Sequence, residues 1–175
     1  PYFHTDACQA ANYLPLHVER LGVDLLTLNG SKIYGPKGVG ALFVRRGISL
    51  SPIMYGGGQE QGLRPGTENV SGIVGFAKAL EITETLKEKE SKRLTKLRDG
   101  FIGTVLKKIP GALLNGDAVK RLPNNVNISI PEIASEHLII ELDAHGIAAS
   151  ARSACKSMDE EGSHVIMALG RNTIG

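Results

Sequence analysis

The hydrophobic positions follow two patterns, short apolar runs in the first part of the chain and helical spacing in the middle. Apolar runs at residues 2–4, 23–28 and 41–46 predict three strands. The second run is almost continuously apolar, which is typical of a strand that is covered on both faces in a parallel sheet. A segment interrupted by Pro15 separates the first two runs, so we expect the order strand, crossover, strand.

From residue 69 the apolar residues recur at helical spacing as far as residue 106, which predicts one long helix. Acidic and basic residues at 87–93 would form its solvated face, with opposite charges in reach of one another. A loop rich in glycine and proline at 56–67 precedes it. We expect the helix to bridge two lobes.

Shorter elements follow residue 110. Apolar and polar residues alternate at 125–130, as in a half-buried strand. Ser135 is a favourable N-cap residue for a helix that Gly146 would end. The expected elements are strands at 112–114, 125–130 and 147–149 and helices at 135–144 and 163–169.

Together these patterns predict an α/β chain in three parts. Residues 1–70 would belong to a large α/β domain, residues 71–108 would form a connecting long helix, and residues 109–175 a small, incomplete α+β C-terminal domain. The chain begins inside a strand pattern and stops where another strand is due. We therefore expect it to be part of a longer protein.

Composition narrows the classes of function. The 175 residues are 42% hydrophobic, enough to bury a core. The formal net charge of +2, from 20 basic and 18 acidic residues, gives no general attraction to nucleic acid or to an anionic membrane. The sequence has neither an apolar run of about 20 residues that would span a bilayer nor a signal-peptide pattern. We expect a cytoplasmic protein with no direct nucleic-acid or membrane partner.

Lys32 and Asp6 are the candidate chemical groups. Lys32 follows a predicted buried strand and lies in the glycine-rich segment 30–40, and Asp6 ends the preceding strand. If these strands are parallel neighbours, both residues lie at their carboxyl ends, where open α/β sheets bind ligands. A lysine amine can hold the aldehyde of pyridoxal 5'-phosphate, and a carboxylate beside the ring nitrogen keeps that nitrogen protonated. Gln9 could donate to the phenolate oxygen, so the residues predict a pyridoxal-phosphate site.

Simpler interpretations exist for the same residues. Lys32 could be a surface lysine, and Asp6 could cap the following segment. Segment 30–40 lacks the Gly-Lys-Ser/Thr ending and the following helix of a nucleotide loop, so we reject nucleotide binding. The five histidines show no ligand spacing, and we predict no metal site.

The two cysteines have different surroundings. Cys155 lies among small residues beside Arg152 and Lys156, two cations that favour the thiolate, so it is a candidate nucleophile. The alternative is a small buried hydrophobic residue. That alternative suits Cys8 better, because alanines surround it at the start of a packed helical segment.

Four segments carry a family resemblance: His-Thr-Asp-Ala-Cys-Gln at 4–9, Gly-Ser-Lys-Ile-Tyr-Gly-Pro-Lys-Gly at 30–38, Arg-Pro-Gly-Thr-Glu-Asn at 64–69 and Ser-Ala-Cys-Lys-Ser at 153–157. In order and spacing they resemble the cysteine desulfurases of the class V aminotransferase fold. The resemblance covers nearly the whole chain. It implies part of the large domain of the fold type I pyridoxal-phosphate-dependent transferases, followed by the small C-terminal domain.

The resemblance implies a role for each site residue. Lys32 would bind the cofactor and move the substrate's Cα proton, and Cys155 would take sulfur from L-cysteine as a persulfide and leave L-alanine. The other implied contacts are Asp6 to the pyridine nitrogen, Gln9 to the phenolate oxygen, Asn29 and Ser31 to the phosphate, and Thr67 to the phosphate of the partner subunit's cofactor. The contact of Thr67 implies a homodimer with shared sites. The resemblance also implies that sulfur passes to an acceptor or iron–sulfur scaffold protein, for cluster assembly or tRNA thiolation.

Some positions depart from the family pattern. The family commonly has histidine, serine and glycine where this chain has Ser31, Asn29 and Arg152. It also places further cofactor and substrate groups outside these 175 residues, so we expect the isolated polypeptide to be impaired. Two alternatives stay open: another class V pyridoxal-phosphate enzyme such as an aminotransferase, in which Cys155 would be incidental, and an inactive fragment that acts as a scaffold.

Overall fold

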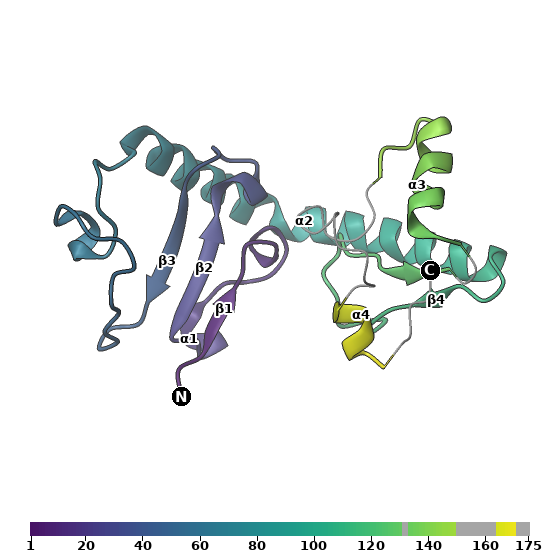
Figure 1. The fold of residues 1–175 in the computed structure, drawn as a ribbon, viewed down its shortest axis with the longest axis horizontal. Coiled ribbons are helices and arrows are strands. Elements are labelled where there is room, and N and C mark those ends of the chain that lie inside the picture. Colours follow the sequence, from purple (N-terminus) through teal and green to yellow (C-terminus); the bar gives the residue numbers. More distant parts are fainter. Residues whose placement is uncertain (131–132, 150–163, 171–175) are drawn as a thin grey trace. The chain divides into compact units, whose positions relative to one another are not determined.

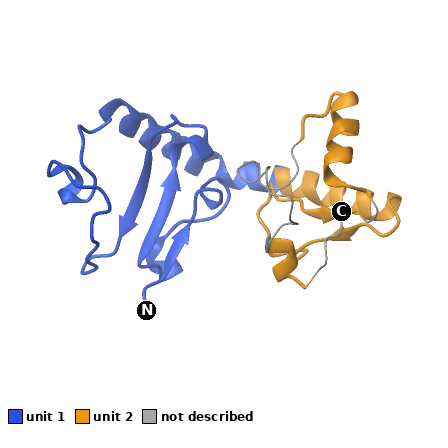
Figure 2. Ribbon diagram, viewed as in Figure 1, with its two compact units in different colours: residues 1–93 blue, residues 94–175 orange. Residues whose placement is uncertain are grey.

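The structure, a computed structural model, describes residues 1–130, 133–149 and 164–170. The chain forms two compact units, Pro1–Arg93 and Leu94–Gly175, which Figure 2 colours separately. Their boundary lies inside α2 (Val70–Lys108), the long helix expected from the helical spacing. The three-part domain division expected from the sequence stays a prediction.

Three strands form a mixed sheet in the first unit (Figure 1). β1 (His4–Asp6) and β2 (Leu25–Asn29) are parallel, which confirms the expected order of strand, crossover and strand. The crossover contains a short 3-10 helix, η1 (Ala10–Asn12), and α1 (Val18–Leu21). β3 (Gly40–Val44) runs antiparallel to β2. The sheet order is β1-β2-β3, so within the described residues both outer strands pair along one edge only.

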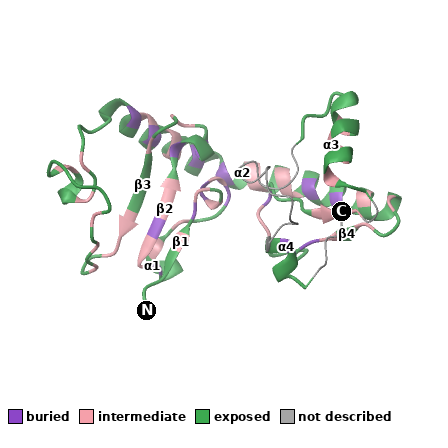
Figure 3. Ribbon diagram, in the orientation of Figure 1, coloured by how far each residue is buried: buried purple, intermediate pink, exposed green. Residues whose placement is uncertain are grey.

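Two clusters of buried side chains hold the first unit together. Figure 3 marks the buried positions along the ribbon in purple. One cluster joins Ala7, just after β1, to Leu26 in the centre of β2. The other joins Ala11, Ile33 and Phe76, which come from η1, from the turn after β2, and from α2. Removing these apolar groups from water is the main favourable contribution to folding. The first part of α2 therefore packs against the two segments that follow β1 and β2.

The glycines of segment 30–40 and of α2 allow close approach of backbones. A Cβ atom on Gly75 of α2 would lie 2.7 Å from Cγ of Pro36, and one on Gly30 would lie 2.8 Å from the Pro36 carbonyl oxygen. Contacts this short would force a neighbouring group to move. The Gly30 N–H also donates to the carbonyl of Val39 at 2.9 Å. The glycine-rich segment is thus a tightly packed turn.

The second unit is built from shorter elements around the C-terminal part of α2. β4 (Leu113–Leu114) pairs antiparallel with β5 (Ile128–Ser129), and both lie within predicted strand segments. Two helices follow, α3 (Ser135–Ala144), with the bounds expected from the sequence, and α4 (His164–Ala168). No helix in the described ranges is both long and apolar enough to cross a membrane.

The C-terminal end of α3 is a glycine-based cap. Gly146 has φ of 75° and donates to the carbonyl of Asp143 at 2.8 Å, and the N–H of Ile147 donates to the carbonyl of Leu142 at 2.9 Å. These two bonds form a Schellman motif, which is a common end for a helix. The expected strand at 147–149 is wrong, because Ile147 turns back onto the helix and no ladder forms at these residues.

The N-terminal end of α3 differs from the expectation. Ala134 precedes the helix with extended backbone angles and makes no side-chain cap, and Ser135 is the first helical residue. The prediction of Ser135 as N-cap is therefore wrong by one position. The Leu138 N–H bonds to the carbonyl of Ala134 at 3.1 Å, so backbone hydrogen bonding alone sets this start.

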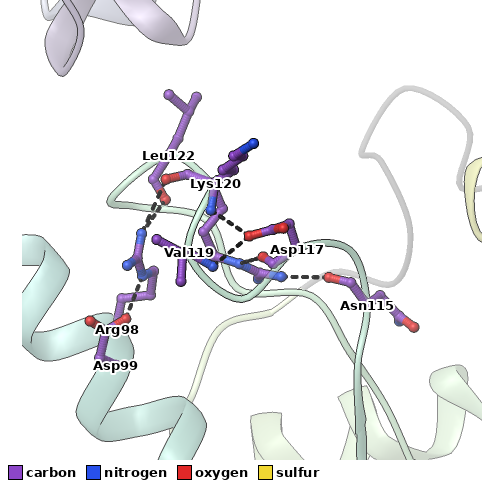
Figure 4. A network of polar contacts seen from close by, with 8 residues as sticks. Arg98, Asp99, Asn115, Asp117, Val119, Lys120 and Leu122 are labelled. Carbon is purple, nitrogen blue, oxygen red and sulfur yellow. Dashed lines mark hydrogen bonds and ion pairs between the residues drawn. The ribbon is translucent and has the colours of Figure 1, made fainter.

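Two arginines stabilise the loop between β4 and β5 (Figure 4). Arg98 of α2, with only 7% of its side chain exposed, donates to the carbonyls of Arg121 and Leu122, each at 3.2 Å. Arg121 in turn donates to the carbonyls of Asn115 and Asp117 at 2.6 and 2.7 Å. Guanidinium groups thus satisfy carbonyls that the short strands leave unpaired.

Candidate functional site

Asp6 lies at the carboxyl end of β1, exposed to solvent. The backbone N–H of Cys8 donates to its Oδ1 at 3.0 Å. Hydrogen bonds from Cys8, the side chain first and the backbone second, hold the pKa of Asp6 below its usual range. The carboxylate is therefore ionised at neutral pH at the end of its strand.

β2 passes directly into the turn that carries Lys32. This turn, η2 (Gly30–Ile33), begins after Asn29, whose side-chain oxygen accepts from the Ser31 N–H at 2.9 Å and from the Ser31 hydroxyl at 2.7 Å. A hydroxyl has one hydrogen to donate. Ser31 gives that hydrogen to Asn29, while the NH₂ group of Asn29 makes no hydrogen bond in the part of the chain that the structure describes.

The Lys32 amine is available for chemistry. Its residue is exposed, and among the described residues the ammonium makes neither an ion pair nor a hydrogen bond. An aldehyde can react directly with an unpaired amine. An amine in a salt bridge would first have to leave its acidic partner.

Parallel pairing places Asp6 and Lys32 at the same edge of the sheet. Asp6 stands opposite Thr27 in the register, and β2 ends two residues later at Asn29. Both charges act on the thiol of Cys8: burial and then Asp6 raise the pKa of Cys8 to about 11, and the positive charge of Lys32 opposes that rise. The acid and the amine therefore act in opposite directions on the same thiol.

Cys8 itself is not a reactive group. Its side chain is half-buried, and its Sγ lies 3.9 Å from the carbonyl oxygen of Thr27. With a raised pKa the sulfur stays protonated at physiological pH, and a protonated thiol is a poor nucleophile. This agrees with the expectation of a packed cysteine.

The remaining predicted site residues are Gln9 and Thr67, which the structure describes, and two residues that it does not. Gln9 is exposed at the start of η1, next to the Asp6 turn. Thr67 is exposed in the loop between η3 (Gln59–Gly62) and α2, and no hydrogen bond among the described residues joins it to the groups above. Cys155 and Arg152 lie outside the described residues. The roles assigned to all of these residues stay predictions.

The sequence did not indicate one contact at this site. Nδ2 of Asn12 donates to the backbone carbonyl oxygen of Lys32 at 2.6 Å, across a separation of 20 residues. No motif signals such a bond, because it depends on how η1 and η2 pack against each other in the folded chain.

A groove of about 750 Å³ lies beside the same turn. Its walls come from η1, from the segment around η2 and from α2, and include Asn12, Tyr34, Pro36, Ala79 and Leu86. These walls are mostly apolar. Lys32 is not among the residues that line the groove, so this hollow is separate from the amine.

The sequence profile of the family Aminotransferase class-V matches residues 2–171, nearly the whole chain. The chain belongs to the class-V aminotransferase family. Enzymes of this family generally depend on pyridoxal phosphate, the cofactor that the Lys32 and Asp6 pattern predicts.

Curated relatives of this class-V family member are named as cysteine desulfurases. It is 52% identical over 167 residues to cysteine desulfurase IscS 1 of Archaeoglobus fulgidus, and 48% identical over 168 residues to cysteine desulfurase IscS of Dictyoglomus turgidum. These alignments cover 95% and 96% of this chain but 44% and 43% of the relatives. The chain thus spans less than half the length of the curated relatives it matches.

A solved structure shares the fold of this class-V family member. The NifS-like protein from Rickettsia africae superposes with a TM-score of 0.85 at 33% identity, over 98% of this chain and 44% of that chain. The α/β architecture expected from the sequence is therefore one that NifS-like proteins also have.

Proposed function

We propose that the protein containing this chain is a pyridoxal-phosphate-dependent cysteine desulfurase. It would convert L-cysteine to L-alanine and hold the sulfur as a persulfide on Cys155. In fold terms, the chain would be part of a fold type I large domain together with part of the small C-terminal domain. The observation that carries the proposal is the 52% identity to a cysteine desulfurase over 95% of the chain.

The residues at the sheet edge fit pyridoxal phosphate. Bound there, the cofactor supplies an aldehyde for an amine and a ring that withdraws electrons from the bond to be broken. Lys32 provides the unpaired amine, and Asp6 a carboxylate that stays ionised and can keep the pyridine nitrogen protonated. For the phosphate, the free NH₂ of Asn29 is a ready donor, whereas Ser31 would have to turn its hydroxyl away from Asn29. Gln9 would donate to the phenolate oxygen.

In the proposed sulfur transfer, Lys32 moves protons and Cys155 accepts the sulfur atom. After substrate binding, the Lys32 amine takes the proton from Cα of cysteine. The Cys155 thiolate would then attack the substrate sulfur, the Cβ–S bond would break, and its electron pair would take up a proton to complete the methyl group of alanine. Lys32 would finally return its proton to Cα, which restores the free amine and completes alanine. The sulfur atom stays on Cys155, and a second protein accepts it.

Partners and location complete the proposal. Thr67 would reach the phosphate of the partner subunit's cofactor, which requires a homodimer. A sulfur-acceptor or iron–sulfur scaffold protein would take the persulfide sulfur, for cluster assembly or tRNA thiolation. We place the enzyme in the cytoplasm, without direct nucleic-acid contact.

The roles of Lys32 and Cys155 can be separated in the full-length protein. Lys32→Ala should abolish the yellow cofactor band and the activity together. Cys155→Ser should keep the band but lower alanine and sulfide production by roughly three orders of magnitude or more, because the nucleophile is lost. Absorbance spectra and alanine release from L-cysteine with a thiol reductant measure both effects.

Lys107→Ala, at the end of α2, is the matched control and should change neither measurement. A Cys155→Ser protein that retains its activity would point to an aminotransferase instead. A wild-type protein that never becomes yellow with added cofactor would point to a non-catalytic scaffold.

A further inference from the structure

We propose that Asn12 is a positioning residue for Lys32. Its side-chain amide holds the backbone carbonyl of Lys32 and thereby fixes the direction in which the lysine side chain leaves the turn. This inference rests on the proposed function, in which the Lys32 amine carries the cofactor. It adds a residue that lies outside all of the predicted catalytic and cofactor contacts.

The hydrogen bond from Asn12 gives a partner to a backbone carbonyl in η2. A short helix leaves its last carbonyls without partners inside the helix. In η2 the Gly30 carbonyl accepts from the N–H groups of Tyr34 and Gly35, but the Lys32 carbonyl accepts from the Nδ2 of Asn12, at 2.6 Å. Asn12 therefore takes the place of a backbone donor at the residue that carries the amine.

The backbone after Lys32 adopts an uncommon conformation. Tyr34 has φ of 61°, in the left-handed region, although it is neither glycine nor asparagine. Such a conformation is unfavourable for a residue other than glycine and persists only where its surroundings hold it. A side-chain bond two residues earlier is one such restraint.

Both ends of the bond are anchored in the core. Ala11, next to Asn12, is 1% exposed, and Ile33, next to Lys32, is 3% exposed. The two belong to one cluster with Phe76 of α2. The hydrogen bond thus joins two backbones that are already packed together, so little entropy is lost in forming it.

The bond also connects the two halves of the candidate site. Asn12 lies on the segment that begins with Asp6 and includes Gln9, and Lys32 lies on the segment that begins with Asn29. Errors of about 1 Å in the placement of a catalytic group can lower rates roughly a hundredfold. A direct link between the segments keeps the amine aligned with the carboxylate.

The test uses Asn12→Leu in the full-length protein. Leucine has nearly the shape of asparagine without its donors, and Asn12 lines a mostly apolar groove that can accept it. We expect kcat for L-cysteine to fall about tenfold, with KM changed by less than about twofold, because one hydrogen bond that orients the base is lost. Capture of the cofactor by the cofactor-free protein, followed by reduction and mass spectrometry of the Lys32 peptide, should slow by a similar factor.

Two further variants make the result specific. Asn12→Gln keeps the donor and should recover most of both rates. Asn124→Leu, an exposed asparagine in the second unit, is the matched control and should change neither. Should Asn12→Leu fold poorly, Asn12→Ala gives the same comparison, with thermal unfolding measured alongside.

The outcomes separate this inference from the function on which it rests. A wild-type protein that forms no reducible adduct at Lys32 overturns the proposed function and this inference together. A wild-type adduct, with unchanged kcat and capture rate in both Asn12→Leu and Asn12→Ala, overturns the positioning role alone. If Asn12→Leu lowers kcat and raises KM by the same factor, and Asn12→Gln does not restore either value, Asn12 has a purely structural role. That result would also contradict the proposal.

Discussion

At the scale of single residues, local surroundings determine what each group can do. Asp6 and Cys8 are two residues apart, yet the hydrogen bonds between them lower the pKa of the acid and contribute to raising that of the thiol. The same contact therefore favours a permanent charge on one side chain and a permanent proton on the other. Cys8 therefore acts as a hydrogen-bond donor that keeps the Asp6 carboxylate ionised.

The chemical reactivity of Cys8 tests this view. With its pKa at about 11 instead of 9.0, the fraction of thiolate at pH 8 should fall roughly a hundredfold, and alkylation slows with it. We expect iodoacetamide to label Cys8 far more slowly in the folded protein than in urea, with a rate that rises with pH up to about 11. Peptide mass spectrometry distinguishes Cys8 from Cys155. Equal folded and unfolded rates at pH 8 would contradict the prediction.

The sequence indicates some of these residues but not others. Asp6 and Lys32 could be predicted because each follows an apolar run, and the ends of parallel strands meet at one edge. Asn12 could not, because its partner lies 20 residues away and only the packing of η1 against η2 brings the two together. Cys155 was found from its neighbours in sequence alone, and its role stays a prediction.

At the scale of elements, the packing of α2 against the lysine turn can be tested with two glycines of the same helix. A Cβ atom at Gly75 would meet Pro36, whereas one at Gly103 would meet no other part of the described chain within 4 Å beyond its own helix. Gly75→Leu should lower the free energy of unfolding by about 1–3 kcal/mol through overpacking. Urea denaturation measures the change.

Gly103→Leu is the matched control, with the opposite sign expected. It replaces glycine by a good helix former at an exposed position and should raise the free energy of unfolding by about 0.5–1 kcal/mol. Two variants with the same effect would mean that α2 does not press on the turn as described.

Helices were easier to predict than strands, for a physical reason. The bounds of α3 and its end at Gly146 follow from local signals, since periodicity and a residue that tolerates positive φ act within a few positions. The direction of β3 does not, because a strand has the same side-chain period in parallel and antiparallel pairing. The failure at Ser135 is also local: Ala134 takes the cap position with backbone hydrogen bonds alone.

At the scale of the whole molecule, the proposed cofactor site would depend on more than these residues. Among the described residues, that site would have an amine from Lys32, a carboxylate from Asp6 and the amide of Asn29 as a proposed phosphate donor. The curated relatives are more than twice as long as the part that this chain matches, and the family resemblance places further phosphate and substrate contacts there.

We therefore expect the 175-residue polypeptide to bind pyridoxal phosphate at least about tenfold more weakly than the full-length protein, since each missing hydrogen bond to a charged phosphate weakens binding by roughly that factor. Equilibrium dialysis of both cofactor-free proteins gives the two dissociation constants. Lys32→Ala in the full-length protein shows how much of the affinity is due to the covalent link. Equal constants for the short and long proteins would mean that the described residues alone suffice.

The outer margins of β1 and β3 have a practical consequence. Each presents a row of backbone amides and carbonyls that nothing in the described chain satisfies, and such rows recruit any extended peptide that can complete them. At high concentration the most abundant peptide of that kind is another copy of the same polypeptide. We therefore expect the isolated polypeptide to associate through these two strands as its concentration rises, and light scattering across a dilution series would show it.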